Sequence, residues 1–314
     1  MVKVETYKSE YPTSYFRLEP LESAGADSES PLLLFLPGNP GLVEYYIDYL
    51  QLVQAAFPQL EILCVSHAGF STTHGEGPKE LYPLSKQISH KLEVLRKEAF
   101  DGSGSKRQLL VMGHSVGSWI LQRVILGVLD DSDLNSSYEV AFAGLITPTI
   151  TDIAKSSNGR ILKGLSERIS RLPKLVGHLS FLISCLPSSV LEYLVGLKLG
   201  AASSGSLAAT CKLVTSPSIV EQALSLASEE MRVIGADQSV NERFFGCKFE
   251  KWAYFAAADH WVADETRGLL MELYSENVDT ELGAKGGITH SFCVSESKEF
   301  AEITISALEK AAVL

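Results

Sequence analysis

The most restrictive feature of this sequence is an apolar run that breaks into Gly-x-Ser-x-Gly and then continues with a helical pattern. Residues 109–112 are all apolar, and Gly113, Ser115 and Gly117 follow directly. From Trp119 onward, apolar residues recur at helical spacing. A serine on such a strand-to-helix turn has a strained backbone that needs small neighbours, and its hydroxyl is exposed. We therefore predict that Ser115 is a nucleophile.

Two backbone N–H groups near this turn are candidate oxyanion donors. The N–H of Val116 lies in the first turn of the expected helix, where it points toward a substrate carbonyl. An earlier apolar run ends in the loop 37–41, with the sequence Pro-Gly-Asn-Pro-Gly. Because Pro40 has no N–H and Gly38 lies at the turn itself, Asn39 is the predicted second donor. An ordinary tight turn is the alternative interpretation of this loop.

Strand and helix patterns alternate along most of the chain. Apolar runs that we interpret as strands cover residues 15–18, 31–36, 61–67, 109–112, 140–146 and 251–258, and helical patterns cover residues 83–99 and 298–312. This alternation predicts an α/β fold with a mostly parallel central sheet and helices on both faces. The alternation lapses in a helical stretch, so we expect a core of residues 1–148 and 247–314 with an inserted cap of residues 149–246.

The candidate acid and base follow the nucleophile along the chain. Asp259 comes after a late apolar strand run, and His290 lies on a glycine-rich loop before the closing helix. Enzymes with a nucleophile on a Gly-x-Ser-x-Gly turn use the order serine, acid, histidine, which Ser115, Asp259 and His290 reproduce. Asp264, one turn further on, is the alternative acid. Such a triad hydrolyses esters through an acyl-enzyme, and we expect it to need no metal or organic cofactor.

The composition limits the partners of the chain. The formal net charge of −11 over 314 residues argues against a nucleic-acid partner, because phosphate binding needs a basic face. The five cysteines are widely spaced and form no Cys-x-x-Cys pair, which predicts reduced thiols rather than disulfides or a zinc site. The first ten residues are polar, so we expect no signal peptide. No apolar run reaches the 18 residues or so of a membrane-spanning helix.

The predicted cap contains a positively charged segment followed by strongly apolar ones. Residues 155–174 contain six basic side chains and one acidic one, a local net charge of +5. Residues 175–199 follow and are strongly apolar. Such a segment suits a phospholipid interface, and Leu179, Leu182 and Leu186 are the predicted lipid contacts. Equally, these leucines can line an acyl-chain pocket or pack the cap.

Two further histidines bracket a loop rich in glycine, serine and threonine. We interpret His67 and His74 as loop polar residues, with contact to substrate as the alternative. His114 and His260 adjoin predicted triad members and are interpreted as packing or orienting residues.

Several motifs together resemble one known family. They are Leu36-Pro37-Gly38-Asn39-Pro40-Gly41 followed by Tyr45-Tyr46, then Gly113-His114-Ser115-Val116-Gly117, Asp259-His260-Trp261 and Thr289-His290-Ser291-Phe292. In these motifs the chain resembles the lipid droplet-associated hydrolases, a branch of the α/β-hydrolase superfamily. The resemblance spans nearly the whole chain and is weakest in the cap.

This resemblance implies a serine esterase or lipase-type hydrolase that acts on neutral-lipid esters such as sterol esters or acylglycerols. It also implies peripheral association with the phospholipid monolayer of lipid droplets and with the cytosolic face of the endoplasmic reticulum. A catalytically weak or inactive droplet scaffold that regulates neutral-lipid storage is the alternative.

Overall fold

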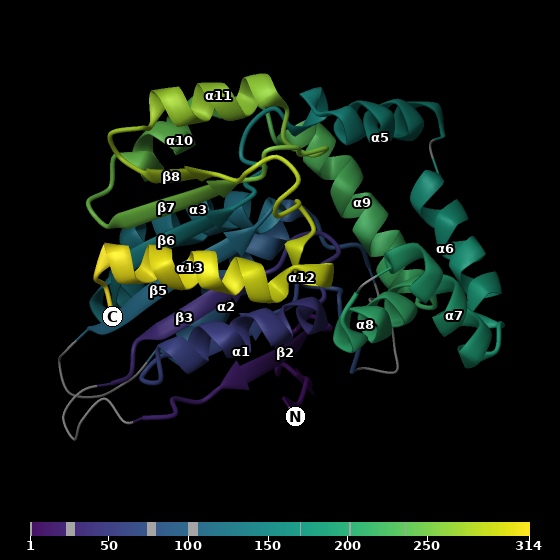
Figure 1. Ribbon diagram of the computed structural model, residues 1–314, viewed down its shortest axis with the longest axis horizontal. Helices are drawn as coiled ribbons and strands as arrows, with labels where there is room; N and C mark the ends of the chain where they lie inside the picture. The colour runs from purple at the N-terminus through teal and green to yellow at the C-terminus, as the bar shows by residue number, and fades with distance from the viewer. Residues whose placement is uncertain are drawn as a thin grey trace.

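One mixed sheet organises the protein (Figure 1). The computed structural model describes residues 2–22, 29–73, 80–99, 106–169, 171–200, 202–235 and 237–314. The strands are β1 (Glu5–Thr6), β2 (Ser14–Leu18), β3 (Leu32–Leu36), β4 (Glu61–Val65), β5 (Arg107–His114), β6 (Tyr138–Ile146), β7 (Glu250–Phe255) and β8 (Asp279–Leu282). Their order across the sheet is β1-β2-β4-β3-β5-β6-β7-β8. Only the β1–β2 and β2–β4 pairs are antiparallel among the described strands.

Helices cover both faces of this sheet and form an additional layer beside it (Figure 1). They are η1 (Val43–Tyr46), α1 (Ile47–Ala56), α2 (Leu84–Glu98), α3 (Val116–Asp130), α4 (Ser132–Ser137), η2 (Ile153–Lys155), α5 (Ser157–Arg168), α6 (Leu172–Ser184), α7 (Ser188–Leu199), α8 (Ser204–Val214), α9 (Pro217–Val233), α10 (Gln238–Phe245), α11 (Asp264–Leu273), α12 (Phe292–Ser295) and α13 (Ser297–Ala311). Helices α1 and α13 pack together on one face, and α2 and α3 pack together on the other. This arrangement agrees with the predicted fold class.

The central strands are apolar along their whole length because both of their faces are covered. Every residue of β3 and β4 is buried, and so are residues 109–114 of β5. The edge strands β1 and β8 are short and polar, so the sequence pattern did not predict them. The sheet core therefore follows from hydrophobic pattern alone, whereas its edges do not.

The helices α5 to α9, inserted between β6 and β7, form a cap beside the sheet (Figure 1). Helix α9 contacts α2 of the core, while α6 packs on α9 and α7 packs on α8. Helix α10 follows the cap in sequence and packs against α3, where Gln122 Nε2 donates a hydrogen bond of 3.0 Å to Asn241 Oδ1. The part of the expected cap that lies in α10 is thus on the core side. Among the described residues, no helix is long and apolar enough to cross a bilayer.

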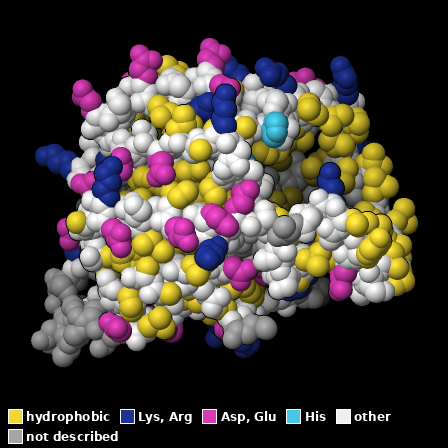
Figure 2. Space-filling model, in the orientation of Figure 1, with side chains coloured by type: hydrophobic (Ala, Val, Ile, Leu, Met, Phe, Trp, Pro, Cys, Tyr) yellow, Lys and Arg dark blue, Asp and Glu magenta, His cyan; other side chains and the backbone are white. Residues whose placement is uncertain are grey.

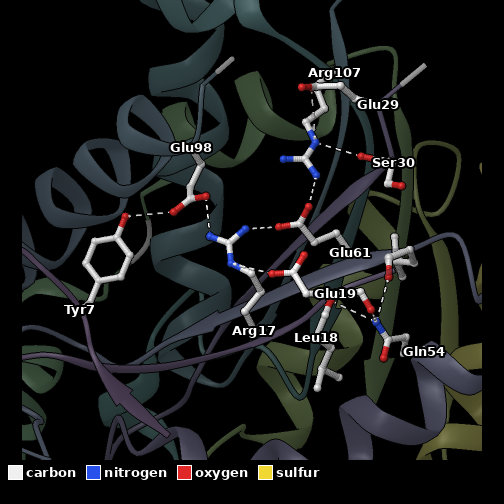
Figure 3. A network of polar contacts seen from close by, with 11 residues as sticks. Tyr7, Arg17, Leu18, Glu19, Glu29, Ser30, Gln54, Glu61, Glu98 and Arg107 are labelled. Atoms are coloured by element: carbon white, nitrogen blue, oxygen red, sulfur yellow. Dashed lines mark hydrogen bonds and ion pairs between the residues drawn. The ribbon is translucent and has the colours of Figure 1, made fainter. Parts of the chain in front are cut away.

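Charged side chains form a network of ion pairs at the amino ends of the parallel strands (Figure 3). Arg17 of β2 forms ion pairs with Glu61, the first residue of β4, and with Glu98 of α2. Arg107, the first residue of β5, pairs with the same Glu61 and donates to the Ser30 carbonyl. The network joins three strands and one helix. It lies at the end of the sheet opposite the loops described next.

Candidate active site

Ser115 lies on a sharp turn between β5 and α3. Its φ of 55° is in the left-handed region, and its N–H donates to the Ile146 carbonyl at 2.9 Å. A Cβ on Gly117 would lie 2.3 Å from the Leu36 carbonyl oxygen, and one on Gly113 would lie 2.5 Å from the Gly117 backbone. The two glycines are therefore required because α3 starts directly against β3 and β5, and the turn exposes the serine hydroxyl.

The three residues predicted as a triad come together from separate loops. Ser115 Oγ lies 3.0 Å from His290 Nε2, and Asp259 Oδ2 lies 2.8 Å from His290 Nδ1. Because a carboxylate only accepts hydrogen bonds, Nδ1 carries the proton, and Nε2 is left to accept from the serine hydroxyl. The imidazole therefore has the tautomer that a general base for Ser115 needs.

Asp259 is held in its charged form. Burial alone would raise the pKa of this carboxyl, but the bond from His290 and the N–H groups of Trp261 and Val262 lower the pKa below its ordinary value. The alternative acid, Asp264, is exposed at the start of α11 and pairs with Arg267 at 3.0 Å. The geometry thus brings Asp259, and not Asp264, to the imidazole.

Two N–H groups beside Ser115 have no acceptor. Val116 is the first residue of α3, and Asn39 lies in the loop between β3 and η1. Neither N–H makes a hydrogen bond to the part of the chain that the structure describes. Both are available to donate to an acceptor in the site, and their role as oxyanion donors stays a prediction.

A relay of hydrogen bonds connects the Asn39 loop to the His290 loop. His114 Nε2 donates to the His290 carbonyl at 2.8 Å, so His114 Nδ1, in a neutral ring, must accept from Tyr46 OH at 2.7 Å. The Tyr46 oxygen in turn accepts the Gly38 N–H at 2.9 Å. Burial, with a smaller effect of His290, lowers the pKa of His114 to about 3, so this ring stays neutral. His114 therefore orients the loop of the base, a role in keeping with its interpretation as an orienting residue.

A cavity of about 420 Å³ opens onto Ser115 and His290. Figure 2 shows the surface hollowed where the cap meets the core. Its apolar walls come mainly from the cap and include Ile153, Leu162, Leu199, Leu213, Leu224 and Val294. Within the described residues, no group of three or more metal-ligating side chains is present. The volume and lining suit an apolar small molecule or acyl chain.

The three leucines predicted as lipid contacts lie outside this cavity. Leu179, Leu182 and Leu186 belong to the outer part of the cap and are 50%, 64% and 42% exposed. The alternative that they line the pocket is therefore wrong. His67, expected in a loop, is buried beneath Gly41 and does not line the cavity, and His74 lies outside the described residues.

Two residues that sequence reasoning did not assign belong to the site. Tyr46 supplies the central hydroxyl of the relay, and its position just after the loop 37–41 was its sole signal. Glu230 of α9 lines the cavity and is only 4% exposed. Glu230 lies on the same face of α9 as Ile219 and Leu226. An acidic residue within the apolar stripe of a helix is unusual, and this pattern could have identified Glu230 from the sequence.

Comparisons with known proteins agree with this architecture. In solved structures, an α/β hydrolase fold protein from Burkholderia ambifaria aligns with a TM-score of 0.59 at 14% identity, covering 97% of each chain. A structure from work on carboxylesterases of Nitrososphaera gargenis aligns with a TM-score of 0.61 at 12% identity, covering 99% of each. These likenesses establish the α/β-hydrolase fold.

Sequence comparisons identify the family. The lipid droplet-associated hydrolase of Drosophila melanogaster is 25% identical over 90% of each chain. The mouse protein of the same name, from Mus musculus, is 25% identical over 90% of this chain and 86% of its own. The family model described as "Lipid-droplet associated hydrolase" matches residues 29–293. This chain therefore belongs to the lipid droplet-associated hydrolase family, whose fold is that of the α/β hydrolases.

Proposed function

We propose that this protein is a serine hydrolase that cleaves carboxylic esters of neutral lipids at a lipid droplet surface. The observation that carries the proposal is the contact of Ser115 Oγ with His290 Nε2, at 3.0 Å, at the base of an apolar cavity. Asp259 completes the arrangement from the other side of the imidazole. This set of groups supports acyl transfer and needs no added cofactor.

In the proposed mechanism, Ser115 Oγ attacks the ester carbonyl carbon while its proton passes to His290 Nε2. The Asn39 and Val116 N–H groups stabilise the oxyanion that forms. His290 then protonates the leaving oxygen, the alcohol departs, and an acyl-enzyme remains. Water gives a proton to the same nitrogen and attacks the carbonyl carbon of the acyl-enzyme. His290 then returns this proton to Ser115 Oγ as the bond between Oγ and the acyl group breaks, so the acid leaves and Ser115 is restored. Asp259 stays ionised throughout and stabilises the imidazolium.

The neutral-lipid substrate is supported by the apolar cavity walls and by the names of the relatives. Acyl groups of sterol esters or acylglycerols fit an apolar pocket in which the polar groups gather around the reacting carbonyl.

Docking on a lipid surface is supported by the outer face of the cap. Helices α6 and α7, here called the outer hairpin, expose Leu179, Phe181, Leu182, Leu194 and Leu197. Figure 2 shows hydrophobic side chains gathered at this side of the molecule. The six basic residues of the segment 155–174 are exposed. Apart from Lys155, which pairs with Asp152, none of these six forms an ion pair within the described residues. Apolar side chains flanked by cations suit a phospholipid monolayer. Association with the endoplasmic reticulum stays a prediction.

Active-site labelling tests the proposed chemistry. A fluorophosphonate probe reacts with an activated serine, so the protein should be labelled and Ser115→Ala should not. Ser291 provides a matched control because it lines the same cavity and forms no side-chain cap bond. The Ser291→Ala variant should be labelled like the unmodified protein. Folded protein that resists the probe would contradict the proposal and favour the catalytically inactive scaffold.

A further inference from the structure

A buried acid of the cap faces the same cavity as the nucleophile. Glu230 lies on α9, is 4% exposed and lines the pocket together with Ser115 and His290. No cation pairs with it among the described residues. The mechanism described above does not use this carboxyl. A buried, unpaired acid in a catalytic cavity calls for a functional explanation, because burial of a lone carboxylate is costly.

Glu230 contacts Asn39, which lies in the loop 37–41 between β3 and η1. Asn39 Nδ2 donates to Glu230 Oε1 at 2.9 Å and to the Ala223 carbonyl at 2.9 Å, so α9 holds the Asn39 side chain at two points. The backbone N–H of this same residue is one of the two free donors beside Ser115. Helix α9 is itself fixed to the core, because Glu229 Oε2 accepts the Leu84 N–H at 2.9 Å. Oε2 of Glu230 makes no hydrogen bond within the described residues.

The charge state of Glu230 follows from its surroundings. Burial raises the pKa of this carboxyl to about 8, the bond from Asn39 acts in the lowering direction, and the neighbouring Glu229 adds to the rise. The other titratable groups that line the cavity are Tyr45, Tyr46, His114, His290 and Cys293. Burial raises the pKa of Tyr45 and of Cys293 to about 12, and that of Tyr46 well above its ordinary value, while His114 stays neutral.

We propose that Glu230 is a positioning residue of the oxyanion site: its protonated carboxyl fixes Asn39, and its ionisation limits ester turnover at alkaline pH. This inference rests on the proposed function. Protonated, the carboxyl adds no charge to the cavity in which the oxyanion develops. Ionised, it places a negative charge in the same low-dielectric space and opposes formation of the tetrahedral intermediate. The cap thereby contributes to chemistry that the core residues perform.

Steady-state kinetics on a short soluble ester, p-nitrophenyl butyrate, test the inference between pH 6 and pH 9. For the unmodified protein, kcat/KM at pH 9 should be about tenfold lower than at pH 7, as expected for loss of one proton. Glu230→Gln should keep at least about a third of the pH 7 rate and lose this alkaline decline, because glutamine can accept from Asn39 and stays neutral. Glu230→Ala should lower kcat about tenfold with KM nearly unchanged, since Asn39 loses one of its two acceptors and keeps only the Ala223 carbonyl.

Glu229→Gln is the matched control. Glu229 is the adjacent carboxyl on the same helix and does not line the cavity. This variant should keep the pH 7 rate, because glutamine can still accept the Leu84 N–H. It should also keep the alkaline decline, which should start at a slightly lower pH because Glu229 contributes to the raised pKa of Glu230. The proposal is overturned if Glu230→Gln retains the decline of the unmodified protein, or if Glu229→Gln abolishes it.

A stability measurement separates failure of this inference from failure of the proposed function. The ordinary pKa of a glutamate is 4.5, and the folded protein raises that of Glu230 to about 8. The proton therefore stabilises the folded state fully below pH 4.5, and this stabilisation is lost as pH rises through about 8. Thermal unfolding of the unmodified protein should move to lower temperature relative to Glu230→Gln between pH 5 and pH 8. A difference that stays constant over this range would show that Glu230 is ionised throughout and would overturn the proposal, whether or not any ester is cleaved.

Discussion

The loops around Ser115 differ from the outer hairpin of α6 and α7 in how many of their side chains have partners within the chain. At the site, the polar side chains of the relay and the triad each bond a group from another loop or helix. In the outer hairpin, large apolar side chains such as Phe181 and Leu197 are 59% and 66% exposed. The polar side chains at the site thus find their hydrogen-bond partners within the chain, whereas the outer hairpin leaves apolar surface exposed for an external partner.

This difference suggests that chemistry and surface docking reside in separable parts of the molecule. In the outer hairpin, α6 packs on α9 and α7 packs on α8, and among the described residues of the two helices Leu199, at the end of α7, is the one that lines the cavity. Changes at the exposed residues of the hairpin should therefore alter binding to lipid without altering the reaction, and changes at the loops around Ser115 should alter the reaction without altering binding to lipid. The variants below test that separation.

The largest effect is expected for Asp259→Asn. An asparagine can donate to Nδ1 of His290 and so favours the wrong tautomer, in which Nε2 no longer accepts the serine proton. Turnover of a soluble ester should fall by about 10⁴-fold while the protein stays folded and still binds lipid vesicles. Ester kinetics, circular dichroism and vesicle flotation measure these three properties.

Asp264→Asn is the control for that change, since this exposed carboxyl bonds only Arg267 in the described structure. It should leave turnover nearly unchanged. Greater damage from Asp264→Asn than from Asp259→Asn would contradict the assignment of the acid.

Much of the site was predictable because its signals are local. Ser115 lies between glycines after a buried strand, and the order of Asp259 and His290 along the chain follows from the fold class. Their contact distances were not predictable, because they depend on where three loops from distant parts of the chain end. Asp259 itself lies beyond the end of β7 at Phe255, on a loop that the bonds from Trp261 and Val262 hold in place.

The second effect concerns the lipid surface. Replacing Leu179, Leu182 and Leu186 by serine removes apolar area worth about 1 kcal/mol each at an interface, so vesicle binding should weaken about 100-fold. Turnover of a soluble ester should persist, because none of the three lines the cavity. Flotation with vesicles of phosphatidylcholine and phosphatidylserine measures the binding. High salt should weaken binding of the unmodified protein without abolishing it, because the apolar contribution is not screened.

Leu269 and Leu273 of α11 provide matched controls, since they are 49% and 58% exposed on the core. Their replacement by serine should leave vesicle binding unchanged. Equal loss of binding in both sets would show that exposed leucines act without regard to position, and the outer hairpin would not be the docking surface.

The cap was the part that sequence pattern predicted least well. An amphipathic helix has the same pattern whether its apolar face meets a pocket, another helix or a lipid surface. Residues 175–199 therefore allowed each interpretation, and only the packing of α6 on α9 and of α7 on α8 shows which leucines remain exposed. Glu230 was missed for a related reason, because its partner Asn39 lies far away in the sequence.

The smallest effect, and the most specific test of the loops, is expected for Tyr46→Phe. This change removes the hydroxyl that joins the Gly38 N–H to His114 Nδ1 and leaves both groups buried without a partner. Each such group costs about 1–3 kcal/mol, so the protein should unfold at lower temperature. Turnover should also fall, by about tenfold, because the loops of Asn39 and His290 lose their shared connection.

Tyr49→Phe separates these two consequences. Tyr49 is also fully buried, and its hydroxyl contacts Thr304 Oγ1 at 2.9 Å, away from the cavity. This variant should lose stability with kcat unchanged, whereas Tyr46→Phe should lose both. If Tyr46→Phe lowers only the unfolding temperature, the relay stabilises the fold without positioning His290. In that case only the hydrogen bonds of the triad would serve the reaction. The hydrogen bonds of Tyr46 would stabilise the fold, as that of Tyr49 does.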